Sequence, residues 1–177
     1  MFMFFTKNII RFQLPKLIKK QSVKRQTVNY EQSKKVGILV TLHDHEKQHT
    51  IDEFIDLLAA DKKEVQVLCH DKRRARNKIF GYLQFTGRDI SMFGKFKAEH
   101  VIDFINNDFD YLFHLDMEST EVMDKILCLS QAKCRIGNDQ EEHRDFYELM
   151  VKADTLSKVS KLMHHYAKVV NVKEEEV

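Results

Sequence analysis

The segment that determines the architecture reads Val36-Gly37-Ile38-Leu39-Val40-Thr41-Leu42, an unbroken apolar run typical of a strand buried on both faces. Next comes Thr50-Ile51-Asp52-Glu53, which has the form of a capping box and predicts a helix over about residues 50–60. A second apolar run, Val65-Gln66-Val67-Leu68-Cys69, follows. These segments predict a strand–helix–strand unit with two parallel strands.

The same alternation continues along the chain. Strands are predicted over residues 110–115, 133–137 and 146–151, and helices over residues 98–105, 119–129 and 156–170, the second of them capped by Ser119. Residues 71–97 predict a long, partly ordered connection in which residues 82–85 are a candidate strand. We therefore expect an α/β fold, a three-layer Rossmann-like sandwich with a mostly parallel sheet.

Charge is divided unevenly between the two ends of the chain. Residues 1–35 carry nine Lys and Arg side chains against one Glu, whereas residues 36–177 carry 20 basic and 26 acidic side chains. The first 35 residues predict a basic helical arm that ends near Tyr30, in which Phe5, Ile9 and Phe12 share a face and Pro15 interrupts the helix. The predicted organisation is this arm (1–35), a single Rossmann-like domain (36–170) and a charged tail (171–177).

The composition is typical of a protein with a single core and indicates neither a disulfide-rich nor a membrane-spanning protein. With 177 residues and 43% apolar side chains, the chain can bury one core. Cys69, Cys128 and Cys134 lie in apolar runs without CxxC spacing, which predicts reduced core residues rather than a disulfide or metal site. No apolar run reaches the ~18 residues of a membrane span, and residues 1–5 lack the pattern of a secretory signal. We expect a cytoplasmic protein, with peripheral attachment to a membrane left open.

Histidine and carboxylate residues follow three of the predicted strands. Such strand ends are where parallel sheets bind ligands, and the candidate residues are His43, Asp44, His45, His70, Asp71, His114, Asp116 and Glu118. If the first and fourth strands are neighbours, the first three of these approach Asp116 and Glu118, where they could perform acid–base work or hold a divalent metal. Solvated loop residues are the alternative, and they are favoured over zinc for the series His43, His45 and His49. We expect neither a metal nor a cofactor.

Motifs of common enzymes are missing from the sequence. Leu42 is followed by His43-Asp44-His45-Glu46 instead of a glycine-rich phosphate loop, and the chain contains no GxGxxG, Walker or GxSxG motif. A standard nucleotide-dependent enzyme is therefore disfavoured.

Two basic runs are candidate contacts for a polyanion. They comprise Lys7, Arg11, Lys16, Lys19, Lys20, Lys24 and Arg25 in the arm, and Arg73, Arg74 and Arg76 farther on. We expect a non-catalytic binding or adaptor module whose residues 1–30 dock on an anionic surface, either a membrane face or RNA, or on a partner protein. Packing of the arm on its own body or on a second copy stays open, because a basic arm and an acidic body attract each other.

Several segments resemble a family of short Bacteroidota proteins that carry a domain-of-unknown-function label. The likeness rests on Asn107-Asp108-Phe109-Asp110-Tyr111-Leu112, on residues 130–137 (Ser-Gln-Ala-Lys-Cys-Arg-Ile-Gly), on Tyr147-Glu148-Leu149-Met150-Val151 and on the closing helix, and it implies no activity. Within residues 36–137 the chain also resembles the N-terminal Rossmann-like half of heptosyltransferase-type glycosyltransferases. That second resemblance implies the fold but not the activity, because the sugar-nucleotide domain has no counterpart here.

Overall fold

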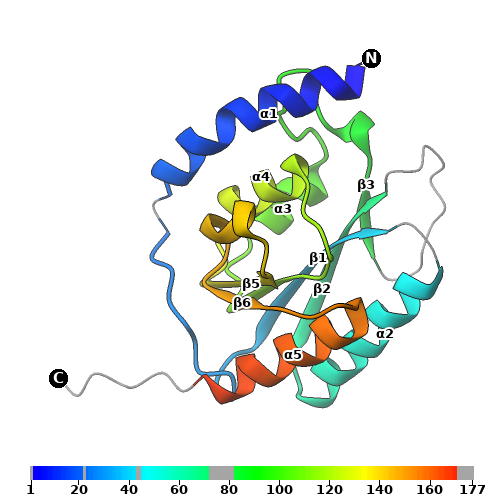
Figure 1. Ribbon diagram of the computed structural model, residues 1–177, viewed down its shortest axis with the longest axis vertical. Helices are drawn as coiled ribbons and strands as arrows, with labels where there is room; N and C mark the ends of the chain where they lie inside the picture. The colour runs from blue at the N-terminus through cyan, green and yellow to red at the C-terminus, as the bar shows by residue number, and fades with distance from the viewer. Residues whose placement is uncertain (1, 22, 43–44, 72–81, 171–177) are drawn as a thin grey trace.

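The computed structural model describes residues 2–21, 23–42, 45–71 and 82–170. They form a six-stranded sheet in which every neighbouring pair is parallel, with the strand order β3-β2-β1-β4-β5-β6 (Figure 1). The strands are β1 (Lys35–Leu42), β2 (Glu64–Asp71), β3 (Leu83–Phe85), β4 (Tyr111–His114), β5 (Cys134–Asn138) and β6 (Leu149–Val151). The predicted α/β sandwich is thus confirmed, and β1 pairs with β4, the arrangement on which the expected approach of the strand-end residues depended.

Helices cover both faces of the sheet. One face carries α2 (His45–Ala60) and α5 (Leu156–Val169), which share a hydrophobic core with Ile38, Val40 and Phe113. The other face carries α3 (Glu99–Asn106) and α4 (Glu121–Leu129), over a second core that includes Leu39 and Leu112. Two short 3₁₀ helices, η1 (Gly87–Asp89) and η2 (Glu141–Phe146), lie in the connections. Alternation of side chains along each strand therefore supplies both cores.

Two predicted helix starts differ from the structure. α2 begins at His45, so Thr50 and its expected capping box lie inside the helix. α4 is capped by Thr120 rather than Ser119, because the Thr120 hydroxyl accepts a hydrogen bond from the backbone N–H of Met123. The expectation that the three cysteines are reduced core residues is confirmed, since all are free and buried.

The N-terminal helix α1 (Phe2–Lys19) packs on α4 as an additional layer (Figure 1). Ile10 and Leu14 are buried in the same core as the apolar residues of α4, whereas Phe5 and Phe12, which we expected on one shared face with Ile9, are 55% and 87% exposed. The helix ends at Lys19, well before Tyr30, and Pro15 does not interrupt it. Pro15 costs one backbone hydrogen bond, but its ring faces solvent, and neighbouring apolar residues hold the last turn on the core.

Residues 23–34 return from α1 to the start of β1 along the body. Arg25 donates hydrogen bonds to the carbonyl oxygens of Ser130, at 2.8 Å, and Ala132. The Tyr111 hydroxyl donates to the Val28 carbonyl oxygen. This segment is therefore fastened to the domain. None of the described helices has both the length and the apolar character needed to cross a membrane.

Candidate functional site

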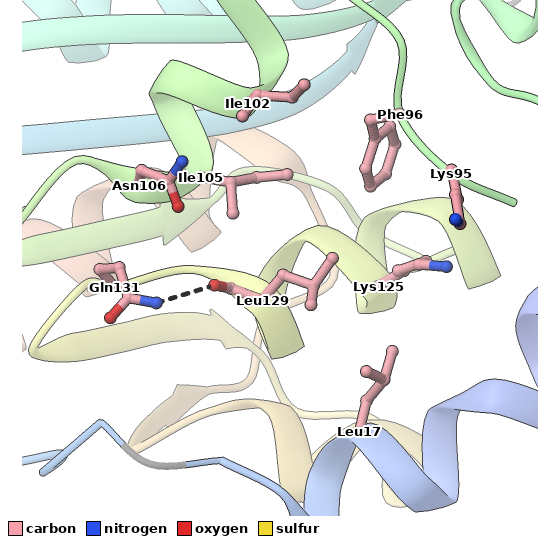
Figure 2. Close-up of a pocket in the computed structure, with 9 residues that line it drawn as sticks. All are labelled: Leu17, Lys95, Phe96, Ile102, Ile105, Asn106, Lys125, Leu129 and Gln131. Atoms are coloured by element: carbon pink, nitrogen blue, oxygen red, sulfur yellow. Dashed lines mark hydrogen bonds between the residues drawn. The ribbon is translucent and has the colours of Figure 1, made fainter.

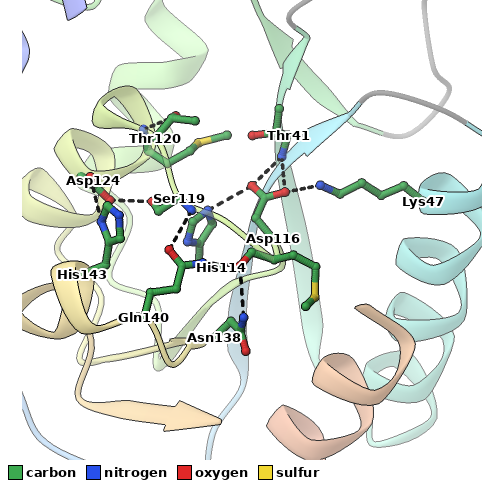
Figure 3. A network of polar contacts seen from close by, with 12 residues as sticks. Thr41, Lys47, His114, Asp116, Ser119, Thr120, Asp124, Asn138, Gln140 and His143 are labelled. Atoms are coloured by element: carbon green, nitrogen blue, oxygen red, sulfur yellow. Dashed lines mark hydrogen bonds and ion pairs between the residues drawn. The ribbon is translucent and has the colours of Figure 1, made fainter. Parts of the chain in front are cut away.

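Polar side chains gather at the carboxyl edge of the sheet, between β1 and β4 (Figure 3). From this edge the chain passes from β1 to α2 on one face and from β4 to α4 on the other face. Such a point of divergence is where ligands bind in open parallel sheets. We call the polar residues at this point, described next, the strand-end network.

Asp116 is the centre of the strand-end network. Its carboxylate accepts hydrogen bonds from the backbone N–H of Thr41 at 2.9 Å and from Nε2 of His114 at 3.0 Å, and it pairs with Nζ of Lys47. Burial alone would raise the pKa of Asp116, but the hydrogen bond from His114 and the charge of Lys47 hold this pKa below its ordinary value. Asp116 is therefore a buried carboxylate whose charge is balanced within the protein.

His114 joins Asp116 to Tyr147. Because a carboxylate only accepts, Nε2 of His114 donates to Asp116, and Nδ1 of the same ring lies 2.6 Å from the Tyr147 hydroxyl, with which it shares a hydrogen bond. Burial raises the pKa of Tyr147. The ring of Tyr147 lies against Gly137 of β5, where an added Cβ would be 2.2 Å from Cε1 of the ring. Residue 137 must therefore be glycine for Tyr147 to reach His114.

A second group of polar side chains surrounds the start of α4. The Ser119 hydroxyl donates to Oδ1 of Asp124 at 2.5 Å, and Nδ1 of His143 lies 3.2 Å from Oδ2 of the same carboxylate. Burial raises the pKa of Asp124, although Ser119 and His143 act in the opposite direction. Asn138 and Gln140 both donate to the carbonyl oxygen of Met117, which fixes the turn after β4. Asp124 is thus protonated more readily than an exposed aspartate would be, because burial raises its pKa.

A cavity of about 650 Å³ borders this second group. Asp124 and His143 line one side of it, and Lys7 and Arg11 of α1 line another. Glu121 and Glu142 also line the cavity, so it presents both signs of charge and does not select an anion. A bound molecule could exchange a proton with Asp124 or His143 there.

The structure separates the residues that we expected at the strand ends. His114 and Asp116 belong to the strand-end network, whereas Glu118 is exposed beside it. His70 and Asp71 are buried at the end of β2, where the ring of His70 stacks on Phe85.

The expected residues after β1 are only partly described. His43 and Asp44 lie outside the described residues, and His45 begins α2. Among the described residues, no group of three His, Cys, Asp or Glu side chains is arranged to hold a metal ion.

Most of the predicted basic contacts lie on the surface of the first 24 residues. Arg11, Lys16, Lys19, Lys20 and Lys24 are exposed. Arg25 differs from them, because its guanidinium is bound to carbonyl groups of the body and burial lowers its pKa to about 10. The other expected basic run, with Arg73, Arg74 and Arg76, lies outside the described residues.

The exposed side of α1 combines basic and aromatic side chains. We call Phe5, Arg11, Phe12, Lys16 and Lys19 the outer face of α1; all five are exposed. No acidic residue occurs between residues 2 and 19. Within the described part of the chain, the three basic side chains of the outer face form no ion pair.

Sequence reasoning missed four members of the strand-end network and its surroundings: Lys47, Asp124, His143 and Tyr147. Lys47 lies in the first turn of a helix that was expected to begin later. Tyr147 and His143 come from the connection between β5 and β6, and no spacing in the sequence relates them to His114 or Asp124. The one sequence feature related to this contact is Gly137 near the end of β5, because a glycine within a strand can mark the close approach of another group.

Comparison with known proteins identifies a family but no activity. A model described as a family of unknown function (DUF6913) matches residues 7–170, which include most of α1 and all of the sheet. A search of curated proteins finds no match. The likeness to heptosyltransferase-type glycosyltransferases and the Bacteroidota origin stay predictions.

Proposed function

Since the chain belongs to the DUF6913 family, whose function is unknown, we propose its function from its own surface: it is a binding module that docks on the anionic face of a membrane through the outer face of α1. The observation that carries this proposal is Phe12, which is 87% exposed among basic side chains. Helices that lie in a membrane interface combine large apolar side chains with Lys and Arg in this way.

Exposed apolar side chains extend beyond α1 itself. Nε2 of Gln13 donates to the carbonyl oxygen of Phe93 at 3.2 Å, so the loop between β3 and α3 lies beside the helix (Figure 1). Phe93 and Met92 are 64% and 44% exposed in this loop. Transfer of such side chains from water into the interface is favourable by about 25 cal/mol per Å² of apolar surface. Met92 has no ring for stacking on a base, which favours lipid over RNA.

The charges near these side chains favour an anionic surface. Arg11, Lys16 and Lys19 of the outer face have no carboxylate partner in the described residues, and Lys95 and Lys97 are exposed in the adjacent loop. Each Lys or Arg near an anionic membrane contributes about 1 kcal/mol of attraction. Because the opposite side of α1 already packs on α4, docking through the outer face would leave the fold unchanged.

The strand-end network offers less support for a function. The buried atoms of Asp116 and His114 that could meet a ligand already bond Thr41, Lys47 and Tyr147. A ligand would have to displace these contacts, so the geometry suits the structural role of holding β1, α2 and β4 together.

Sedimentation with vesicles tests the docking proposal. The full chain should sediment with phosphatidylcholine vesicles that contain phosphatidylglycerol, and salt should weaken this binding. Replacing Lys16→Gln and Lys19→Gln together should weaken binding about thirtyfold, since two charges contribute about 2 kcal/mol. Replacing Phe5→Ser and Phe12→Ser together should also weaken binding, by about tenfold or more.

Matched control variants are available on the other face of the sheet. Lys158→Gln with Lys161→Gln removes the same charge from α5, and Tyr166→Ser removes an exposed ring from the same helix. Both should bind vesicles like the unaltered chain. If the α5 variants lost as much vesicle binding as the α1 variants, or if the chain bound RNA but not vesicles, the proposal would be overturned.

A further inference from the structure

A second cavity, of about 480 Å³, lies between α1, α3 and α4, away from the strand-end network (Figure 2). Its middle is apolar and is lined by Leu17 of α1, Phe96 of the loop before α3, Ile102 and Ile105 of α3, and Leu129 of α4. Ile102 is 41% exposed at its edge. The volume falls within the range of small-molecule sites, about 300–1,000 Å³.

One end of this cavity carries a buried lysine without a negative partner. Lys125 is only 6% exposed, and its ammonium donates to the neutral side-chain oxygen of Gln13. Among the described residues, no carboxylate pairs with Lys125, and burial lowers its pKa. A lysine ammonium has three N–H donors, and a buried charge is costly unless it is paired. This end of the cavity therefore favours an anion.

The remaining polar groups make the two ends of the cavity different. Figure 2 shows Lys95 and Lys125 at the same end, whereas Asn106 and Gln131 lie at the opposite end, with the apolar side chains between them. Lys95 is exposed and can add a second positive charge at the rim. A ligand that matches this arrangement, with two lysines at one end and apolar side chains next to them, has a negative head group and an apolar body.

We propose that this cavity binds an amphiphilic monocarboxylate, with its carboxylate on Lys125 and Lys95 and its chain along Leu17, Ile105 and Leu129. A carboxylate is the anion of choice because it can accept from both ammonium groups without bringing excess charge into an apolar site. This binding can be tested apart from membrane docking: Lys95 lies near both sites, but none of the lining residues belongs to the outer face of α1, whose residues the vesicle test changes.

Calorimetry with dodecanoate, below the concentration at which it forms micelles, tests the proposal on the full chain. Dodecanoate should bind, and dodecanol, which has the same chain but no charge, should bind about tenfold more weakly or worse. Lys125→Met keeps the length of the side chain and removes the charge. It should therefore weaken the binding of dodecanoate by a similar factor and leave the binding of dodecanol unchanged. No binding of dodecanoate, or equal binding of the two probes, would overturn the proposal.

Two further variants keep the test decisive. Lys97→Met removes a lysine from the same loop but outside the cavity, and it should bind dodecanoate like the unaltered chain. Ile102→Trp places a bulky ring at the exposed edge of the cavity and should abolish binding. If Lys125→Met fails to fold, the proposal is tested by Ile102→Trp and by the comparison of dodecanoate with dodecanol. Undiminished binding of dodecanoate by Ile102→Trp contradicts the assigned site.

Discussion

Residue 137 has no room for a side chain, because the ring of Tyr147 lies against it. We predict that Gly137→Ala lowers the free energy of unfolding by about 3 kcal/mol, since the ring must move and its hydrogen bond to His114 is lost. Urea denaturation of the two proteins measures this difference.

A double-mutant cycle separates the contact with Tyr147 from a general intolerance of alanine in β5. In a Tyr147→Leu background the clash is relieved, so Gly137→Ala should cost at least about 1 kcal/mol less than it does alone. Equal costs in the two backgrounds would show that the ring is not what restricts residue 137.

At the residue scale, the centre of the strand-end network could be predicted but its partners could not. His114 and Asp116 follow an apolar strand, and the parallel arrangement places that strand end at the point of divergence. Tyr147 meets His114 from 33 residues away, and this contact depends on how β5 and η2 are placed. The positions of β5 and η2 depend on tertiary packing, and no local pattern in the sequence predicts them.

At the scale of elements, strands were more predictable than the ends of helices. β1 is buried from Val36 to Leu42 and is apolar there except for Thr41, which the sequence shows directly. α2 starts five residues before its expected cap, and its first turn is held by the ion pair between Lys47 and Asp116. The carboxylate expected to help cap it, Glu53, instead lies 3.7 Å from Nδ1 of His49, within the same helix. Tertiary contacts thus replaced the local signal.

Asp61, just after α2, connects three segments of the chain. Its carboxylate accepts from the Tyr30 hydroxyl at 2.8 Å, from Nε2 of His164 at 2.6 Å and from Nζ of Lys168 at 3.0 Å. Burial would raise the pKa of Asp61, but these hydrogen bonds lower it from 3.8 to about 2. The carboxylate therefore holds α5 and the segment before β1 against the end of α2.

We predict that Asp61→Asn lowers stability at neutral pH by about 2 kcal/mol, because charged hydrogen bonds to two segments are lost. Since folding lowers the pKa of Asp61, its stabilisation is present above pH 3.8 and is lost as the pH falls to about 2. The variant should therefore lose less stability over this interval than the unaltered chain does. Urea denaturation across the interval measures both effects.

Asp56→Asn is the matched control for this prediction. Asp56 is exposed on α2 and makes no hydrogen bond or ion pair in the described structure. It should change stability by no more than about 0.5 kcal/mol. If both variants keep the acid dependence of the unaltered chain, Asp61 does not couple the two segments.

At the scale of the whole molecule, the basic helix at the start of the chain shares a hydrophobic core with the sheet. The basic helix α1 contributes Ile10 and Leu14 to the same core as Leu39 of β1 and Leu112 of β4. Its exposed basic side chains Arg11, Lys16 and Lys19 belong to the outer face. Removing residues 1–30 would therefore expose the core, and substitutions on the outer face are the better test of docking.

The last prediction concerns whether α1 unfolds with the domain. Ile10 is fully buried, so Ile10→Ala should lower the free energy of unfolding by about 3 kcal/mol, the usual cost of deleting a buried aliphatic side chain. Because Ile10 shares its core with strands of the sheet, the loss should appear in one cooperative transition, seen alike by circular dichroism and by exposure of the buried cysteines. Phe12→Ala on the same helix is the control and should change stability by no more than about 0.5 kcal/mol. An independent arm would instead leave the main transition of Ile10→Ala where it is in the unaltered chain, since its contacts would melt separately from the sheet.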